Sequence, residues 1–242
     1  MTPAPPMTEE LGGDAKRSYV RQMFTAIAPR YDFLNHVLSF NIDRRWRRRA
    51  VRALRWEESP EGFYLDLCAG TLDLAAELDR QPGFRGSILG ADFVLPMLRL
   101  GRHKTARVLA VGADALDLPF QAQSFDGCTI AFGVRNLADL DRGLGEMARV
   151  LKRGGRVVIL EISTPRTWPF RPLYRFYFRR VLPLIGRLLS RHTTAYSYLP
   201  DSVDQFPGPS EMVTRMRRSG FASVEYQSLS LGIATLFRGV RA

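Results

Sequence analysis

The sequence predicts an α/β domain whose mostly parallel sheet ends in an antiparallel hairpin. From residue 63 onward, short apolar runs typical of strands alternate with helical segments. Such alternation produces βαβ units and a parallel sheet covered by helices. The last two strand-like runs, 222–230 and 233–240, are separated only by Leu231 and Gly232. Because parallel neighbours need a connection of a dozen residues or more, these two strands must be antiparallel.

Length and composition favour one domain. The chain has 242 residues, 45% of them apolar, which is enough for a full core. Residues 1–17 are expected to form a flexible leader and residues 18–242 a single domain. No run approaches the ~20 apolar residues of a membrane span, and the leader lacks the apolar stretch of a secretory signal. Cys68 and Cys128 have no CxxC spacing, so we expect no metal site and a reducing, cytoplasmic location.

Each predicted element follows from hydrophobic period and turn chemistry. Residues 18–56 read as an N-terminal helical cap, broken at Pro29 and around Ser39–Asn41. A basic, aromatic helical insertion, residues 166–200, follows the fifth strand. The seven expected strands are 63–68, 86–92, 106–114, 124–132, 156–162, 222–230 and 233–240. The other expected helices are 72–80, 96–104, 137–151 and 209–220.

The net charge of +11 is concentrated in two segments with arginines at helical spacing. The cap carries Arg44, Arg48, Arg52 and Arg55, and the insertion carries Arg171, Arg175 and Arg179. The opposite side of the insertion is apolar and aromatic: Tyr174, Tyr177, Val181, Ile185 and Leu188. One interpretation is a solvated arginine face on an ordinary packed helix. The other is contact with an anionic membrane surface or a lipidic substrate.

Three successive strand ends carry residues suited to a nucleotide-like cofactor. The first strand is followed by the small-residue turn Ala69-Gly70-Thr71, which lets backbone amides approach a ligand. The second ends at Asp92, where an acidic side chain grips ribose hydroxyls in nucleotide-binding folds. The third ends at Asp114 and Ala115, where a carboxylate can accept from an adenine amine. Helix capping would explain each aspartate singly, but it explains their joint placement poorly.

A parallel sheet that ends in an antiparallel hairpin is typical of class I S-adenosylmethionine-dependent methyltransferases and not of NAD-binding Rossmann domains. Several segments carry a more specific pattern within that Rossmann-like class: VRQMFTAIAPRYDFLNHVLSF, DLCAGTLDLA, the segment from DALDLPF to LKRGG, and VVILEISTP. On these motifs the chain resembles the ubiquinone/menaquinone biosynthesis C-methyltransferase family from about Ser18 to Arg241. The FGVRN stretch, followed by a basic aromatic helix and YSYL, is the most specific.

The resemblance implies that S-adenosylmethionine lies on Thr71, Asp92 and the Asp114–Ala115 pair, above the Ala69–Gly70 turn. The chain departs from the family pattern in this loop. Where the family reads GGTGD, this chain reads AGTLD, with Ala69 and Leu72 at glycine positions, and Ala131 replaces a common serine. We expect Leu72 to belong to the first turn of the following helix and to point into the core.

The resemblance also implies C-methylation of a polyprenylated quinol, with demethylmenaquinol to menaquinol as the favoured reaction and a benzoquinol still open. Aligning the methyl group with a ring carbon supplies ~7–11 kcal/mol, and fixed donors must stabilise the phenolate. Arg135 and Asn136, after the fourth strand, suit that task, and Tyr31 would close the site. Arginine stays protonated, so a water held by Arg135 and a carboxylate is the expected proton acceptor. The structural alternative is pairing of Arg135 with Asp139.

Other functions fit these residues less well or stay open. A nucleic-acid methyltransferase is disfavoured because FGVRN stands where an NPPY-like loop is needed and no cysteine lies beside a proline. No nucleic-acid partner is therefore expected. A phospholipid or other small-molecule methyltransferase stays open, and so does a catalytically silent subunit, given the AGTLD loop. The expected partners are the quinol and an anionic membrane at its inner face, and a homodimer is left open.

Overall fold

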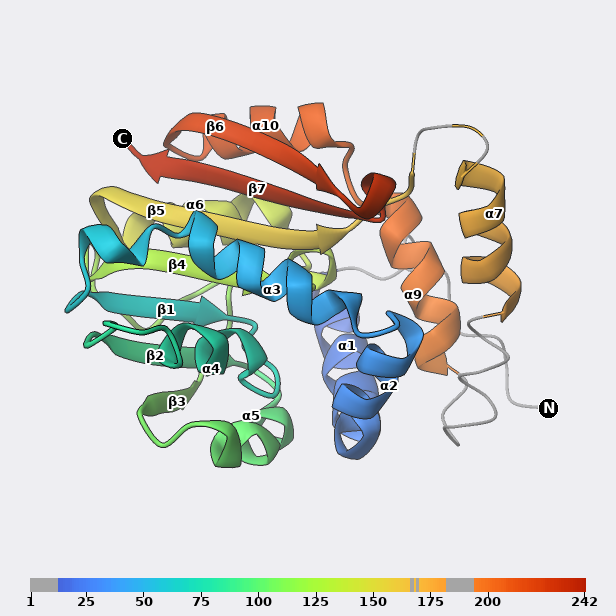
Figure 1. The fold of residues 1–242 in the computed structure, drawn as a ribbon, viewed down its shortest axis with the longest axis horizontal. Coiled ribbons are helices and arrows are strands. Elements are labelled where there is room, and N and C mark those ends of the chain that lie inside the picture. The colour runs from blue at the N-terminus through green and yellow to red at the C-terminus, as the bar shows by residue number, and fades with distance from the viewer. Residues whose placement is uncertain (1–12, 166–167, 169, 182–193) are drawn as a thin grey trace.

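The computed structural model describes residues 13–165, 168, 170–181 and 194–242. Its centre is a seven-stranded sheet with the order β3-β2-β1-β4-β5-β7-β6 (Figure 1). The first five strands run parallel, and β7 pairs antiparallel with both β5 and β6. The predicted sheet and its closing hairpin are confirmed. The strands are β1 Phe63–Leu67, β2 Ser87–Asp92, β3 Val108–Gly112, β4 Phe125–Ala131, β5 Leu151–Ile162, β6 Phe221–Leu229 and β7 Ala234–Arg241.

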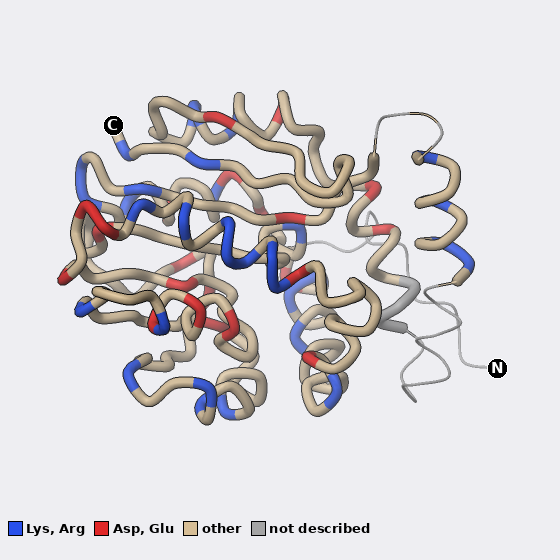
Figure 2. The backbone as a smooth tube through the Cα atoms, viewed as in Figure 1, with Lys and Arg blue, Asp and Glu red and all other residues tan. Residues whose placement is uncertain are grey.

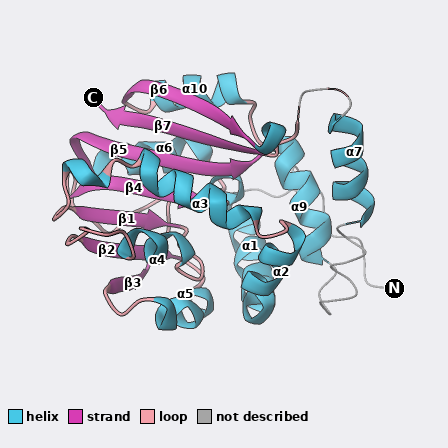
Figure 3. Cartoon of the chain, viewed as in Figure 1, coloured by secondary structure: helices cyan, strands magenta, loops and turns pink. Residues whose placement is uncertain are grey.

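Helices cover both faces of the sheet (Figure 3). Helices α3 (Ile42–Ala53), α4 (Asp73–Asp79) and α5 (Leu95–Gly101) bury apolar side chains against one face. Helices α6 (Leu140–Val150) and α10 (Pro209–Arg218) do the same on the other. Strands that are buried on both faces read as continuous apolar runs. This is why β1 and β4 were easy to recognise in the sequence.

Helix α3 shows why the arginine-rich cap is helical. Its buried positions recur at the three- and four-residue spacing of one helix face: Asp43, Trp46, Arg47, Ala50 and Val51. The predicted arginine row Arg44, Arg48 and Arg52 lies on the exposed face, and Figure 2 shows this basic row along α3. Arg47 was not expected to be buried, although its spacing places it on this apolar face.

The remaining helices gather beyond the carboxyl ends of the strands (Figure 1). They are α1 Gly13–Ile27, α2 Tyr31–Leu38, α7 Phe170–Phe176, a π-helical turn Tyr177–Val181, and α9 Thr194–Gln205. Val20, Leu34, Phe178 and Tyr198 share one apolar cluster that joins the N-terminal helices to the insertion. The predicted cap and insertion, which are far apart in the sequence, therefore form one unit.

Two predicted boundaries were wrong. Helix α1 begins at Gly13, so residues 13–17 belong to the folded domain and not to the expected leader. They are held because Lys16 donates to the Leu137 carbonyl at 2.8 Å and Arg17 pairs with Asp114. Strand β5 begins at Leu151, because Leu151 pairs with Phe125 before an irregularity in the ladder. The predicted breaks in the cap are confirmed by a 3₁₀ turn at Ala28–Arg30 and positive φ at Phe40 and Asn41.

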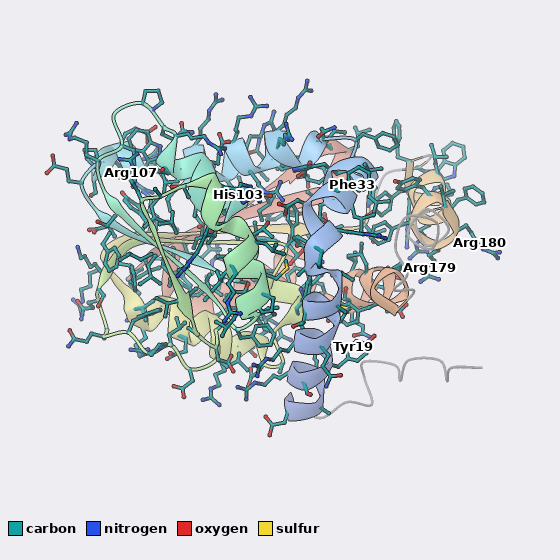
Figure 4. All side chains as sticks on the ribbon, turned by 90° about the horizontal axis from the view of Figure 1, so that it is seen from below. Tyr19, Phe33, His103, Arg107, Arg179 and Arg180 are labelled. Carbon is teal, nitrogen blue, oxygen red and sulfur yellow. The ribbon has the colours of Figure 1, made fainter. Side chains whose placement is uncertain are left out.

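The amphipathic pattern of the insertion is confirmed in its described part. Arg171, Arg175 and Arg179 are exposed, whereas Tyr174 and Tyr177 are half-buried. Figure 4 shows Arg179 and Arg180 at the outer edge, away from the sheet. Ile185 and Leu188, the other apolar positions of the pattern, lie outside the described residues. No helix of the described part is both long and apolar enough to cross a membrane.

Candidate functional site

A pocket opens where β1, β2, β3 and β4 end. The space within it, counted out to the solvent, is about 620 Å³. The predicted residues Gly70, Asp92, Asp114 and Ala115 line it. In open α/β sheets, ligands bind at the carboxyl ends of the strands. The pocket therefore stands where the strand-end residues predicted a cofactor.

The first loop is built around left-handed backbone. Cys68, Gly70 and Leu72 have φ of 51°, 51° and 63°, whereas Ala69 has no positive φ. A Cβ on Gly70 would meet only the Met97 methyl group at 3.6 Å, so the glycine leaves the backbone open toward the pocket. The Ala69 departure from the family pattern is therefore mild, as its backbone lies in the ordinary region for an alanine.

Leu72 points into the core, as predicted, but not from a helical turn. It precedes α4 in a left-handed conformation, and its side chain is fully buried. A Cβ on Gly90 would lie only 2.5 Å from the Leu72 Cδ2 atom, so the leucine fills the space above that glycine. This conformation explains why the family favours glycine here: a left-handed residue with a Cβ costs roughly 1–2 kcal/mol.

Asp92 organises the same loop. One carboxylate oxygen accepts from the Gly70 amide and the other from the Val94 amide, each at 2.8 Å. Burial raises the pKa of Asp92, and these backbone hydrogen bonds oppose the rise. The carboxylate is thus fixed at the pocket wall with acceptor capacity to spare, since each oxygen has two lone pairs. A ribose hydroxyl could use that capacity.

Both carboxylate oxygens of Asp114 already have partners. One oxygen accepts from the Leu116 amide at 2.9 Å, and the other pairs with Arg17 of α1. Arg17 also lines the pocket, so α1 reaches across the third strand end. Lys16 ties the same helix to the Leu137 carbonyl beyond the fourth strand, and burial lowers the Lys16 pKa. Helix α1 therefore covers part of the pocket opening.

Thr71 and Ala69 lie outside the pocket lining. The Thr71 hydroxyl is buried, donates to Asp32, and accepts from Lys104 at 3.0 Å. Lys104 in turn pairs with Asp32 and Asp73. This network joins the loop to helix α2 and to the 3₁₀ turn Arg102–Lys104 that follows α5. In this structure the Thr71 side chain supports the loop from behind.

A second, larger chamber adjoins the pocket. Its space, counted out to the solvent, is about 1610 Å³, and its walls are mostly aliphatic and aromatic. They come from α1, α2 and α3, from α7 with the π-helical turn, from α9, and from the 3₁₀ turn Ser230–Gly232. Phe24, Tyr31 and Phe132 line both spaces. The predicted closing residue Tyr31 thus stands at the junction, where burial raises its pKa.

Arg135 lies at the chamber wall and pairs with the fully buried Glu161 of β5. Glu161 also accepts from the Arg135 amide at 3.2 Å, and the guanidinium donates to the Phe132 carbonyl at 2.7 Å. The alternative pairing with Asp139 is wrong, because the ion pair of Arg135 is with Glu161. Asp139 instead caps α6 by accepting from the Arg142 amide at 2.9 Å. The Arg135 Nε atom is buried and has no hydrogen-bond partner.

Asn136 links the pocket to the insertion. Its side-chain oxygen accepts from the Tyr198 hydroxyl at 3.0 Å, and its amide donates to the Phe132 carbonyl at 3.3 Å. Tyr198 also packs against Tyr19, which lies on the side of α1 that faces α9 (Figure 4). Asn136 lines the strand-end pocket, and its partner Tyr198 lines the chamber.

Sequence reasoning missed several polar residues of the site. Glu161 ends an apolar strand in the LEIS segment, so a strand-end acid was the available signal. Arg47 pairs with Asp43 and Asp73 and places its guanidinium 5.6 Å from the centre of the Phe132 ring. In the sequence it is one of many arginines. Only its place in the apolar row of α3 distinguished it.

Solved structures support the fold. An S-adenosylmethionine-dependent methyltransferase of Thermotoga maritima matches with a TM-score of 0.64 at 18% identity, covering 91% of this chain and 99% of that one. The [4+2]-cyclase SpnF matches with a TM-score of 0.66 at 15% identity, covering 99% and 97%. A cyclase with this fold shows that the architecture alone does not fix the reaction.

Closer relatives come from sequence. The C-methyltransferase UbiE of Geobacter sulfurreducens, named for ubiquinone/menaquinone biosynthesis, is 49% identical over 230 residues, covering 93% of this chain and 89% of that protein. The demethylmenaquinone methyltransferase of Thermus thermophilus is 50% identical over 224 residues, covering 90% and 100%. The model of the ubiE/COQ5 methyltransferase family matches residues 13–241. With a class I methyltransferase fold and this match over nearly its whole length, the chain belongs to the ubiE/COQ5 methyltransferase family.

Proposed function

We propose that this enzyme transfers the methyl group of S-adenosylmethionine to a ring carbon of a prenylated naphthoquinol, converting demethylmenaquinol to menaquinol. The observation that carries the proposal is the junction of the two spaces. A pocket with strand-end carboxylates meets a large apolar chamber at Tyr31 and Phe132, and Arg135 lies in the chamber wall. Relatives named demethylmenaquinone methyltransferase, from Thermus thermophilus and Deinococcus radiodurans, favour the naphthoquinol over a benzoquinol.

The residues of the pocket suit the cofactor chemically. Asp92 would accept from the ribose hydroxyls, Gly70 would let the backbone approach the methionine part, and Asp114–Ala115 would face the adenine. Val94 and Met97 would supply apolar surface for the adenine ring. Because Arg17 holds Asp114, we expect α1 to shift or to exchange that ion pair when the adenine amine arrives. When bound, the cofactor supplies a methyl group already activated by its sulfonium.

The chain must then make a quinol carbon nucleophilic. A ring carbon gains that character when the adjacent hydroxyl loses its proton and the charge delocalises into the ring. The unpartnered Arg135 Nε can donate to that oxygen, and a fixed charged donor in a dry site stabilises the anion without reorganising. A water between the hydroxyl and Glu161 would carry the proton away. As the new C–C bond forms, the bond between the methyl group and sulfur breaks and S-adenosylhomocysteine is left. The ring then passes its C–H proton to the same water and becomes aromatic again, and its oxygen is reprotonated, so that one proton is released overall.

The apolar chamber would exclude bulk water from the reacting atoms and hold the start of the prenyl tail. Phe40, Phe170, Leu173 and Leu231 line the chamber and are also exposed, so they form its rim. Arg171 and Arg175 lie exposed beside this rim. Exposed aromatic and aliphatic groups flanked by arginines suit an anionic bilayer. We therefore propose peripheral contact at the inner face of the membrane, through which a lipid-dissolved quinol enters.

Two measurements test these proposals. The purified protein, S-adenosylmethionine and demethylmenaquinol kept reduced with dithionite should yield menaquinol and S-adenosylhomocysteine in equal amounts. If demethylmenaquinol gives no methylated product but the corresponding benzoquinol does, the substrate is a benzoquinol. If neither quinol is methylated, the proposed reaction is contradicted.

Membrane contact is tested by flotation. The protein should float together with vesicles that contain phosphatidylglycerol, and Leu173→Ser should weaken that binding. Equal behaviour of the two proteins would contradict the rim as the membrane contact.

A further inference from the structure

The chamber wall holds two polar atoms with unused hydrogen-bonding capacity. In the described part of the chain, the Arg135 Nε atom and the Tyr174 hydroxyl are buried and have no partner. Both side chains line the chamber. A buried donor without a partner costs about 1–3 kcal/mol, and native proteins leave few of them. Two such groups on one chamber indicate a ligand with oxygens to satisfy them.

Tyr174 stands out among the described tyrosines of the insertion. The Tyr177 hydroxyl donates to the Leu38 carbonyl, and the Tyr198 hydroxyl donates to the Asn136 side chain, each at 3.0 Å. The Tyr174 ring stacks on Phe178 with 4.9 Å between centroids and 20° between planes. A phenylalanine would make that stacking contact equally well. Packing therefore accounts for the ring but not for the hydroxyl.

The two unpartnered groups belong to side chains that line the same chamber. Burial raises the pKa of Tyr174, and the charge of Arg135 opposes that rise. They reach the chamber from different elements, because Arg135 belongs to the 3₁₀ turn after β4 and Tyr174 to α7. A flat ring carrying oxygens at opposite positions could contact both at once.

We propose that Tyr174 is a substrate-contact residue that donates a hydrogen bond to the quinol oxygen remote from the reacting carbon, opposite the oxygen held by Arg135. This assignment rests on the proposed function for the identity of the ring. The division of labour follows from the chemistry: the oxygen next to the reacting carbon becomes an anion and needs the charged donor, whereas the remote oxygen stays neutral and suits a phenol. Together the two donors fix which ring carbon faces the cofactor pocket.

A binding experiment tests the assignment without requiring methyl transfer. Trp46 lines the chamber, so its fluorescence reports occupancy. The two probes are prenylated 1,4-naphthoquinol, kept reduced, and a prenylated 1-naphthol that lacks only the remote oxygen. The wild type should bind the quinol about 5- to 10-fold more tightly than the naphthol, the value of one buried hydrogen bond. Tyr174→Phe should bind both equally, and the matched control Tyr177→Phe should keep the wild-type preference.

Stability supplies a second readout. Tyr174→Phe removes an unsatisfied buried hydroxyl, so its midpoint of thermal unfolding should equal or exceed that of the wild type. A tyrosine retained for structure would instead lower the midpoint when truncated, and that result would overturn the proposal. So would a Tyr174→Phe variant that still prefers the quinol, or a wild type that has no preference or binds neither probe. A wild type that prefers the quinol but transfers no methyl group would contradict the proposed reaction and leave the Tyr174 contact standing.

Discussion

The cofactor pocket and the apolar chamber share a wall but are built in different ways. The pocket is made by consecutive strand ends of one sheet, and backbone hydrogen bonds to Asp92 fix its loop. The chamber is made by helices of the N-terminal cap and of the insertion after β5, which meet in a cluster that includes Val20, Leu34 and Tyr198. The pocket is thus a product of sheet topology, whereas the chamber is a product of packing between added segments.

The two regions also differ in how their buried polar groups are hydrogen-bonded. Around the pocket, the carboxylates of Asp66 and Asp92 are buried and satisfied by backbone amides and a threonine hydroxyl. In the chamber wall, the hydroxyls of Tyr177 and Tyr198 are hydrogen-bonded, but Arg135 Nε and the Tyr174 hydroxyl are buried and unsatisfied. Satisfied groups indicate a site preorganised before binding, and unsatisfied ones indicate a site completed by its ligand. The predictions below test this difference.

The largest effect is expected at Arg135. Arg135→Lys keeps a positive charge beside Glu161 but removes the Nε donor. We expect methyl transfer to fall by about 100- to 1000-fold, the usual loss for one preorganised donor. The affinity for S-adenosylmethionine should change less than about threefold, since Arg135 does not line the cofactor pocket. Steady-state kinetics with reduced quinol and calorimetry with the cofactor measure the two quantities.

Lysine is preferred to alanine because alanine would leave Glu161 charged, buried and alone, at about 3–5 kcal/mol. Arg238→Lys is a matched control, because Arg238 pairs with Glu225 on the exposed side of the closing hairpin. A kcat of Arg135→Lys within tenfold of the control would refute the role given to the Nε atom. The unsatisfied Nε atom would then no longer indicate that the chamber is completed by its ligand.

The next effect is a pH dependence that originates beneath the pocket. Burial raises the pKa of Asp66 to about 7, against 3.8 for an ordinary aspartate. Between these values the folded state binds more protons than the unfolded state, so this group makes stability fall as pH rises from 4 to 7. The penalty is complete above pH 7 and amounts to at most about 4 kcal/mol. Asp66→Asn should not lose this stability, because its side chain does not ionise.

Denaturant unfolding of the wild type and Asp66→Asn from pH 4 to pH 8 measures this effect. The variant should gain stability relative to the wild type as pH rises, with most of the gain by pH 7. Asp141→Asn, which alters an exposed ion pair with Arg215, should follow the wild type throughout. Parallel pH profiles for Asp66→Asn and the wild type would mean that the buried carboxylate is ionised at no energetic penalty.

The sequence predicted the pocket better than the chamber for a physical reason. Strands of a parallel sheet are buried and bounded by turns, so their ends, and residues such as Asp92 and Asp114, can be located from one-dimensional patterns. Leu72 was correctly placed in the core because its neighbours already specified a strand followed by a helix. Its left-handed backbone was missed, since leucine carries no signal for positive φ.

The chamber residues were harder because their roles depend on contacts across the fold. Tyr174 was correctly assigned to the apolar side of the insertion, but no pattern shows that its hydroxyl lacks a partner while the Tyr177 hydroxyl has one. Glu161 was missed as the partner of Arg135, and Asp139 was considered because it is near in sequence. Tertiary pairing, not sequence distance, decided between them.

A smaller effect is expected for cofactor binding. Asp92→Asn keeps the shape of the side chain but cannot accept from both the Gly70 and Val94 amides, because one terminal group becomes a donor. We expect S-adenosylhomocysteine to bind about 10- to 100-fold more weakly, as for the loss of charge-assisted hydrogen bonds. Quinol binding in the chamber should stay within about twofold. Calorimetry measures the affinity, and Asp141→Asn again serves as the control. If Asp92→Asn binds S-adenosylhomocysteine as tightly as the wild type does, the ribose does not lie on Asp92.

The smallest effect concerns the loop that departs most from its family. Leu72→Gly and Leu72→Ala both lose a fully buried side chain, so their difference isolates the backbone. With φ at 63°, glycine should be the more stable of the two by about 1 kcal/mol. At the buried Leu78 inside α4 the order should reverse, with alanine ahead by about 1 kcal/mol. Free energies of unfolding for the four variants decide the matter. If Leu72→Ala is at least as stable as Leu72→Gly, the backbone at position 72 is not strained. The packing of the Leu72 side chain in the core would then not be compensating for an unfavourable backbone.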